Sequence, residues 1–185
     1  MKTFFLALCL SLAASTLVAL PAKAMLAHSG LMQLCVVNTG NLKTIDRPAF
    51  RLQYPTSWRL GTNQQDFNAD HNFTIMVEGT DSYIEIKIFK LGSITADQLM
   101  ASLMETLDGP LIDTKKRESF TRWGEINGQG RHLMGEIAGF FEGGARIFVS
   151  TENEFGILVT ELYYSDDKEK AMPGFELIRR SFQFK

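Results

Sequence analysis

Alternating apolar and polar residues mark three strands in the first half of the chain. Apolar side chains occupy every second position in residues 50–54, 73–77 and 84–88. A period of two is typical of a strand with one buried face. Residues 79–82, Gly-Thr-Asp-Ser, separate the second run from the third and predict a hairpin turn.

The spacing of apolar residues then changes to that of a helix. Leucine and methionine recur at intervals of three and four between residues 96 and 107. Thr95 and Gln98 have the spacing of a capping box, and Pro110 follows the last apolar residue. The pattern predicts one helix over 96–107 that packs an apolar face on the sheet.

The second half reads as an antiparallel meander that ends in a short helix. Four strands are predicted, over residues 115–126, 129–141, 145–151 and 155–164. The turns between them are predicted at Asn127-Gly128, at residues 142–144 and at residues 152–154. Connections this short make neighbouring strands antiparallel. A helix beginning at Pro173 and a closing strand over 181–185 complete an α+β fold, an antiparallel β-sheet flanked by helices.

The N-terminus has the features of a cleavable signal peptide. Lys2 supplies the positive charge, residues 4–20 are mostly apolar, and Ala22 and Ala24 form an A-x-A cleavage site. A membrane anchor fits less well, since a span needs about 20 strongly apolar residues. A lipid anchor on Cys9 is disfavoured because Leu8 stands where a small residue is required. We expect a secreted or periplasmic product with no stable membrane anchor.

The predicted organisation is a signal peptide over 1–24, an N-terminal lead-in over 25–48 and one domain over 49–185. Cleavage removes Lys2 and Lys23 from the 19 basic residues, which leaves 17 against 21 acidic ones and a net charge of −4. This balance argues against a nucleic-acid partner, which requires a clustered basic surface. Only Cys35 remains after cleavage, so no internal disulfide can form, and we expect it to act as a small buried hydrophobe.

No catalytic or cofactor-binding residue is predicted. A serine hydrolase would need a nucleophile on a glycine-flanked turn, and no serine stands in a G-x-S-x-G context. Of the three histidines, His132 falls within a predicted strand, where packing or surface exposure is the commoner role. The glycine-rich stretch between 124 and 144 lacks the Lys-Ser/Thr ending of a phosphate-binding loop, so no cofactor is expected.

The loop at residues 66–72 contains the candidate metal ligands. Asp66, Asn68 and Asp70 match the first three oxygen positions of a calcium loop, and His71 adds an imidazole. No glycine follows Asp70, and Val77 stands where the twelfth-position acid should be. A solvated loop is the favoured interpretation, and these four residues remain the candidates for a metal site.

Several residues resemble the PsbP-like superfamily, which includes the extrinsic subunit of photosystem II and many exported bacterial proteins. Residues 50–58, FRLQYPTSW, are similar to the family's opening strand, which ends in Tyr-Pro-x-x-Trp. The order of elements and the ending at 178–184 continue the resemblance. It implies an α/β/α sandwich in which Tyr54 and Trp58 are structural.

The resemblance also implies a binding or assembly factor more than a catalyst. We therefore expect an exported, non-catalytic module of the cell envelope whose partner is an unidentified envelope protein or small ligand. A small-ligand or metal-binding periplasmic protein is the alternative.

Overall fold

The structure is a computed structural model that describes residues 42–61, 68, 70–90, 95–151 and 155–185. The predicted signal peptide with Ala22 and Ala24, Cys35, Asp66 and the predicted turn at 152–154 lie outside the described residues. The strands are β1 (Leu42–Asp46), β2 (Phe50–Pro55), β3 (Arg59–Gly61), β4 (Asn72–Met76), β5 (Tyr83–Lys90), β6 (Ile112–Trp123), β7 (Ile126–Ile137), β8 (Phe141–Ser150), β9 (Phe155–Tyr164) and β10 (Gln183–Phe184). The helices are α1 (Ala96–Leu107), a short 3-10 turn (Ser165–Asp167) and α2 (Lys168–Ser181).

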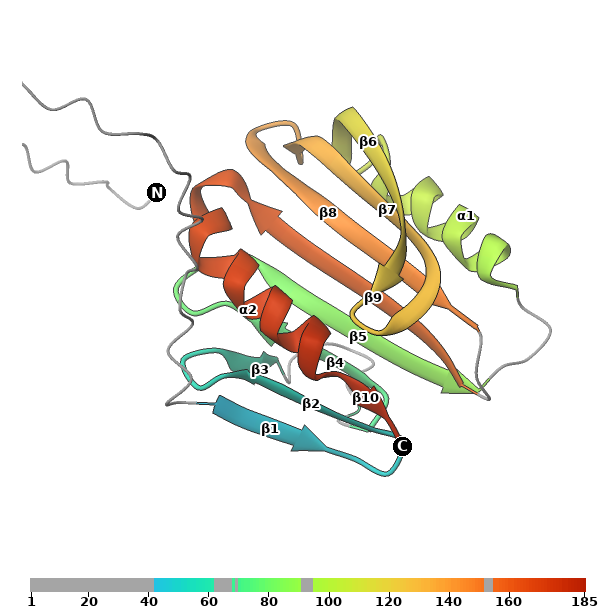
Figure 1. The fold of residues 1–185 in the computed structure, drawn as a ribbon. Coiled ribbons are helices and arrows are strands. Elements are labelled where there is room, and N and C mark those ends of the chain that lie inside the picture. Colours follow the sequence, from blue (N-terminus) through green and yellow to red (C-terminus); the bar gives the residue numbers. More distant parts are fainter. Residues whose placement is uncertain (1–41, 62–67, 69, 91–94, 152–154) are drawn as a thin grey trace, which may run out of the picture. The chain divides into compact units, whose positions relative to one another are not determined.

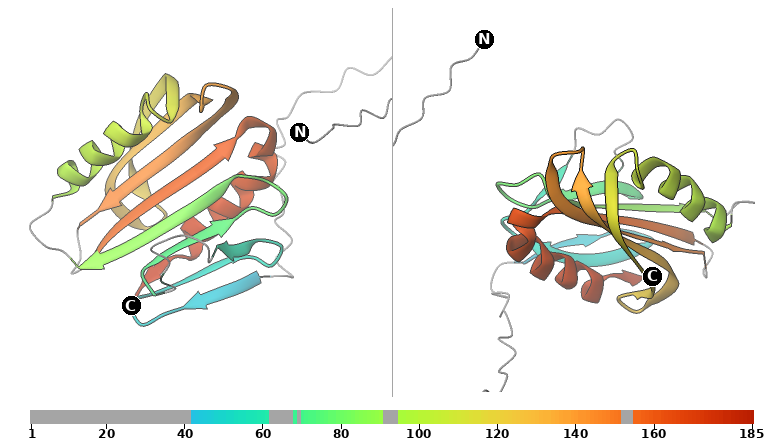
Figure 2. Two further views of the ribbon diagram at one scale, coloured as in Figure 1. Left: turned by 180° about the vertical axis from the view of Figure 1, so that it is seen from behind. Right: turned by 90° about the horizontal axis from the view of Figure 1, so that it is seen from above.

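A seven-stranded antiparallel sheet forms the centre of the fold, in the order β3-β4-β5-β9-β8-β7-β6. Helix α1 packs on β7 and β8. Helix α2 packs on β9 and on β2 of a second sheet, which has the order β1-β2-β10. Figures 1 and 2 show the two helices on opposite sides of the large sheet, with the small sheet on the α2 side. The sequence prediction of an antiparallel sheet flanked by helices is confirmed.

Two hydrophobic cores lie on the two faces of this sheet. Residues of β9 alternate between them: Ile157 and Val159 join the core on the α2 side, whereas Leu158 and Leu162 join the core on the α1 side. The predicted strand residues of β2, β4 and β5 all enter the α2-side core. The period of two therefore identified the buried face of these strands correctly.

Helix α1 forms as the sequence predicts. The Thr95 hydroxyl accepts a hydrogen bond from the Gln98 backbone N–H at 3.2 Å, and the Gln98 side chain accepts one from the Thr95 backbone N–H at 2.9 Å. The reciprocal pair satisfies two donors that would otherwise be left open at the start of the helix. In the described part of the chain, no helix is both long enough and apolar enough to cross a membrane.

The predicted turn at Asn127-Gly128 is wrong. The β6–β7 turn lies at Gly124-Glu125, and Asn127 and Gly128 belong to β7. Gly124 adopts a φ of +59°, and a Cβ there would lie 2.1 Å from the carbonyl oxygen of Arg179 in α2. A residue with a Cβ at this turn position would collide with α2, and a local turn preference does not reveal this contact.

The predicted turn at 142–144 is also wrong. The β7–β8 connection consists of residues 138–140, and residues 142–144 lie inside β8. A Cβ at Gly144 would lie 2.5 Å from the backbone carbonyl oxygen of Leu133 and 2.8 Å from the Tyr163 hydroxyl oxygen. Close approach of a neighbouring backbone is the other common reason for glycine within a sheet.

Both ends of the domain contain more structure than the sequence predicts. Strand β1 lies within the predicted lead-in and pairs with β2. Helix α2 begins at Lys168, five residues before the predicted start at Pro173. Proline within a helix costs a hydrogen bond. Helix α2 continues through Pro173 and buries Ala171, Gly174, Phe175 and Ile178.

Gly174 is a specific test of the packing between α2 and the small sheet. Alanine has a higher helix propensity than glycine by about 1 kcal/mol. However, a Cβ at Gly174 would lie 2.2 Å from ring atoms of the buried Trp58. We expect Gly174→Ala to lower the free energy of unfolding by roughly 1–2 kcal/mol, because overpacking a core outweighs propensity. Chemical denaturation measures this, with the exposed Ser102→Ala as the control; an unchanged or higher stability would contradict the packing.

Candidate functional site

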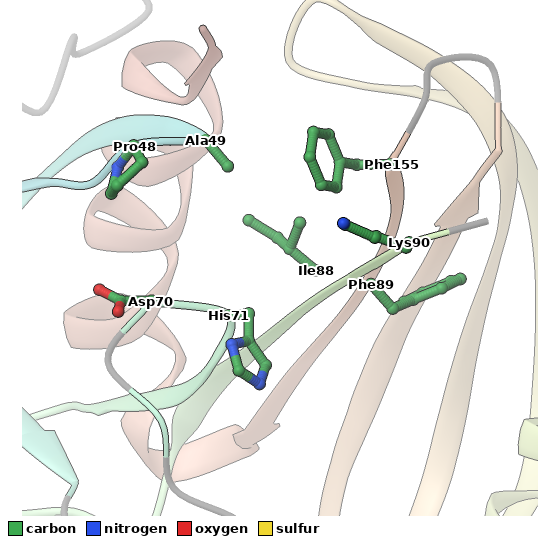
Figure 3. Close-up of a pocket in the computed structure, with 8 residues that line it drawn as sticks. All are labelled: Pro48, Ala49, Asp70, His71, Ile88, Phe89, Lys90 and Phe155. Atoms are coloured by element: carbon green, nitrogen blue, oxygen red, sulfur yellow. The ribbon is translucent and has the colours of Figure 1, made fainter.

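A cavity of about 490 Å³ opens beside the end of β5, and we name it the β5 pocket. Most of its wall is apolar, and three polar residues complete it. The lining residues are Pro48, Ala49, Asp70, His71, Ile88, Phe89, Lys90 and Phe155 (Figure 3). A mainly apolar cavity with a few polar groups is the usual form of a small-ligand site.

Strand pairing assembles the walls of the β5 pocket. Lys90 at the end of β5 pairs with Phe155 at the start of β9. The Ile88 backbone N–H donates to the His71 carbonyl oxygen at 2.7 Å, which attaches the residue 70–71 segment to β5. Phe89 pairs with Gly156 next to the Lys90–Phe155 pair. The Phe89 ring packs directly over this glycine, because a Cβ on Gly156 would lie only 2.3 Å from the ring.

The structure places two of the four candidate metal ligands at the β5 pocket. Asp70 and His71 line it, and the Asp70 carboxylate forms an ion pair with Arg47 at 3.5 Å. The Asn68 side-chain oxygen accepts the Asp70 backbone N–H at 2.9 Å, a local turn that occupies this oxygen. Within the described ranges no three His, Cys, Asp or Glu side chains form a metal-binding group. The fourth candidate, Asp66, lies outside those ranges, so the metal site stays a prediction.

The β5 pocket suits a ligand with an apolar body and an anionic group. Of the eight described lining residues, five are apolar and Lys90 is a cation. Figure 3 shows the Lys90 side chain extending between Phe155 and Ile88. An ammonium beside apolar walls binds an oxyanion while the walls remove the ligand's apolar surface from water.

A second group of polar side chains crosses four strands on the face toward α2. Glu118, His132, Arg146 and Glu161 are consecutive register partners on β6, β7, β8 and β9, and we name them the cross-strand row. Sequence reasoning missed this row. The predicted turn at Asn127-Gly128 would pair Glu118 with Ile137 instead of His132, so the misplaced turn concealed it.

Glu161 is the buried end of the cross-strand row. Its side chain is fully buried, and its Oε1 accepts the Trp123 indole N–H at 2.8 Å. Arg179 of α2 lies 3.2 Å from Oε1, and Arg146 lies 3.5 Å from Oε2. Burial raises the pKa of Glu161, whereas Arg179 and the Trp123 N–H oppose this rise. These contacts attach α2 to the sheet.

His132 joins a glutamate to a tyrosine, an order that resembles a catalytic triad. Its Nε2 lies 2.9 Å from the Tyr163 hydroxyl oxygen, and its Nδ1 lies 3.6 Å from Glu118 Oε2. Burial raises the pKa of Tyr163, which disfavours the phenolate that a nucleophile would need. The arrangement therefore favours a packed hydrogen bond over catalysis, and packing is one of the two roles that its strand position predicts.

His132 should make the stability of the fold depend on pH. Burial, and after it the nearby Arg146, lower the pKa of His132 below its ordinary value of 6.5, while Glu118 opposes this. The unfolded chain therefore binds the proton first, and the free energy of unfolding falls as the pH drops below about 6.5. We expect His132→Gln to remove the part of this loss of stability that protonation of the imidazole causes.

Denaturation midpoints measured at several pH values between pH 7.5 and about pH 5 provide the readout for His132. Tyr163→Phe is the matched control, because it removes the hydrogen bond and retains the imidazole. If His132→Gln and wild type lose stability in parallel over this interval, the imidazole is not the responsible group.

Comparison with known proteins gives matches in structure alone. No family model matches the sequence, and no curated protein matches it. Cyanobacterial PsbP (CyanoP) from Synechocystis sp. PCC 6803 has a TM-score of 0.53 at 14% sequence identity. The match covers 84% of this chain and 99% of CyanoP.

Two further solved structures are similar at lower scores. One is from Bacteroides thetaiotaomicron VPI-5482, with a TM-score of 0.47, 14% identity and coverage of 74% of this chain and 45% of that chain. The other is LpqN of Mycobacterium tuberculosis, which is involved in cell envelope biogenesis, with a TM-score of 0.45, 12% identity and coverage of 78% and 91%. The element order, the large antiparallel sheet and the likeness to CyanoP agree with the resemblance found in the sequence: the chain has a PsbP-like fold.

Proposed function

We propose that the mature chain is an exported, non-catalytic binding or assembly module of the cell envelope. The predicted signal peptide supports export, to the periplasm in a bacterium with two membranes. The observation that carries the binding role is the β5 pocket, a mainly apolar cavity of about 490 Å³ with Lys90 in its wall. The PsbP-like resemblance adds an expectation of binding or assembly more than of catalysis.

The acidic groups at the β5 pocket and in the sheet interior form ion pairs, which supports binding over catalysis. Asp70 at the β5 pocket pairs with Arg47. In the cross-strand row, Glu161 contacts Trp123 and two arginines under α2. A general base must reach a substrate proton from within a cleft. Glu161 lies in the sheet interior, so its contacts stabilise the fold and leave the β5 pocket to bind a ligand.

The proposed ligand has an apolar body and one anionic group, so anilinonaphthalene sulfonate is a suitable fluorescent probe. We expect saturable binding by the folded protein. Ala49→Leu adds apolar volume to the wall of the β5 pocket and should weaken binding about fivefold or more, or about 1 kcal/mol. Lys90→Gln should weaken it as well, because the sulfonate loses its counter-charge. Fluorescence titration measures both effects.

The matched control for Ala49→Leu is Ala101→Leu, the same substitution on the exposed face of α1. All variants must retain the wild-type denaturation midpoint, since a loosened core would also bind the probe. If Ala49→Leu and Ala101→Leu bind the probe equally, the β5 pocket is not the binding site. Turnover by purified wild-type protein that is lost in His132→Gln would show an enzyme instead.

The alternative function is a metal site built on the residue 66–72 loop. The observation in its favour is that Asp70 and His71 lie together at the β5 pocket. Calorimetric titration with Ca²⁺, Mn²⁺ and Zn²⁺ decides it, using wild type and the double variant Asp70→Ala, His71→Ala. A metal site predicts saturable heat in wild type that the double variant lacks. Flat traces for both proteins would end this alternative.

A further inference from the structure

A second hollow, of about 280 Å³, lies on the α2 side of the large sheet, and we name it the α2-side hollow. Tyr163 of β9 lines it and also belongs to the core on the α2 side. The Tyr163 hydroxyl oxygen lies 2.9 Å from His132 Nε2, which fixes this part of the wall. The other polar lining residues come from β6, β8 and the helical segment after β9: Lys115, Lys116, Glu142, Ser165 and Lys168.

A β-bulge in β6 brings two consecutive lysines to this hollow. Side chains of a regular strand alternate between the two faces of a sheet. The β6–β7 register shifts between Thr114 and Lys116, so Lys115 is an extra residue, and both lysines line the hollow. Gly135 of β7 permits this path, because a Cβ there would lie 2.0 Å from the Asp113 carbonyl oxygen. Bulges are over-represented beside functional sites, where they re-aim a side chain.

The floor of the α2-side hollow consists of backbone. Gly135 and Gly143 are register partners on β7 and β8, and both line the hollow. Gly144, the next residue of β8, stands between the lining residues Met134 and Tyr163 and has no side chain. Glycines within a strand often mark a place where a ligand or another backbone approaches closely.

The two lysines of the bulge already have anionic partners. The Lys115 ammonium is bonded to Glu136 of β7. The Lys116 ammonium lies 2.8 Å from Glu118 Oε1 on the same strand. These two pairs neutralise much of the positive charge that β6 brings to the hollow.

Lys168 and Glu142 are the charged lining residues that remain. Within the described ranges, neither has an oppositely charged side chain at ion-pair distance. The Lys168 ammonium lies 6.0 Å from the centre of the Tyr163 ring. Glu142 stands directly opposite Glu136 in the β7–β8 register, where like charges are destabilising. The hollow therefore presents one ammonium and one carboxylate without a counter-charge, and a local choice that disfavours folding is typical of a functional site.

We propose that the α2-side hollow binds a small zwitterion, a molecule with one oxyanion and one primary ammonium group. The oxyanion contacts the Lys168 ammonium and the Ser165 hydroxyl, which stand three residues apart on the helical segment. The ligand ammonium contacts Glu142 and offsets its repulsion from Glu136. Charge-assisted hydrogen bonds of this kind are stronger than neutral ones. A free amino acid or short peptide and a phosphoethanolamine head group share this chemistry.

The size and charge of the α2-side hollow disfavour other ligands. Its volume lies just below the usual range for ligand pockets, about 300–1,000 Å³, which limits the bound group to a small one. A simple anion would meet Glu142 as a like charge. A simple cation would meet the ammonium of Lys168.

The α2-side hollow is separate from the β5 pocket. Phe155 lines the pocket and Tyr163 lines the hollow, eight positions further along β9. At about 3.3 Å per residue the two positions are roughly 25 Å apart. Ligand binding at one site can therefore fail while the other site binds.

Titration of the isotope-labelled protein, followed by NMR, tests the proposal. The probes are glycylglycine, whose oxyanion is a carboxylate, and O-phosphorylethanolamine, whose oxyanion is a phosphate. We expect at least one probe to give saturable amide shifts at Gly143 and Ser165, which line the hollow. The buffer has low salt, because salt screens solvent-exposed charges. A response to one probe alone assigns the oxyanion to that class.

Two isosteric or near-isosteric variants remove the proposed contacts one at a time. Glu142→Gln and Lys168→Gln should each weaken binding of the responding probe about tenfold, as expected for loss of one hydrogen bond to a charged group. The controls Glu105→Gln on α1 and Lys170→Gln on α2 make the same changes at exposed positions outside the hollow and should leave the affinity unchanged. Because all four residues are exposed, no variant should lower the denaturation midpoint.

Analogues without the ammonium group test the zwitterion directly. N-acetylglycylglycine and ethyl phosphate are the matched analogues of the two probes. We expect the analogue to bind wild type about tenfold more weakly than its probe, and Glu142→Gln to abolish this difference. The absence of saturable shifts with both probes, equal affinity of probe and analogue for wild type, or equal effects of Glu142→Gln and Glu105→Gln would overturn the proposal.

Discussion

Strand β9 is buried on both faces, and the rest of the structure depends on this constraint. Eight of its ten residues are buried, and they contribute alternately to the core under α1 and the core under α2. A strand covered on both sides must have a layer on each face, which the single helix α1 provides on one side. On the other side, α2 and the three-stranded sheet share the task, with Trp58 packed edge-on against Phe175 at 5.6 Å.

The same burial explains why a charged side chain at the centre of the sheet has so many partners. A buried carboxylate is costly unless it is paired and hydrogen-bonded. Glu161 on β9 meets this condition in part: Arg146 from β8 and Arg179 from α2 pair with its charge, and its Oε1 accepts a hydrogen bond from Trp123 of β6, whereas its Oε2 has no hydrogen-bond partner. The cost of burying one charge is offset by contacts that also determine where α2 lies. The polar chemistry of the sheet interior is thus used for positioning, and the surfaces available for binding lie at the ends of the sheet.

The two ends of β9 lie next to different surfaces. At its start, Phe155 and Lys90 contribute to a cavity of a size and polarity that suit a small amphipathic anion. At its end, the neighbouring hairpin exposes Phe140 and Phe141 to solvent.

The sequence by itself predicted an export signal, and it determined the period-two strands β2, β4 and β5, the capped helix α1 and the resemblance to a PsbP-like fold. These features depend on local spacing and on chemistry between near neighbours. It also placed Asp70 and His71 in a candidate loop, but not beside Ile88 and Phe155. The turns at Gly124 and Ala138 were visible only in the tertiary structure, where they lie against Arg179 and Leu111, which are distant in the sequence. The cross-strand row follows from those turns, since a shift in register changes every partner across a sheet.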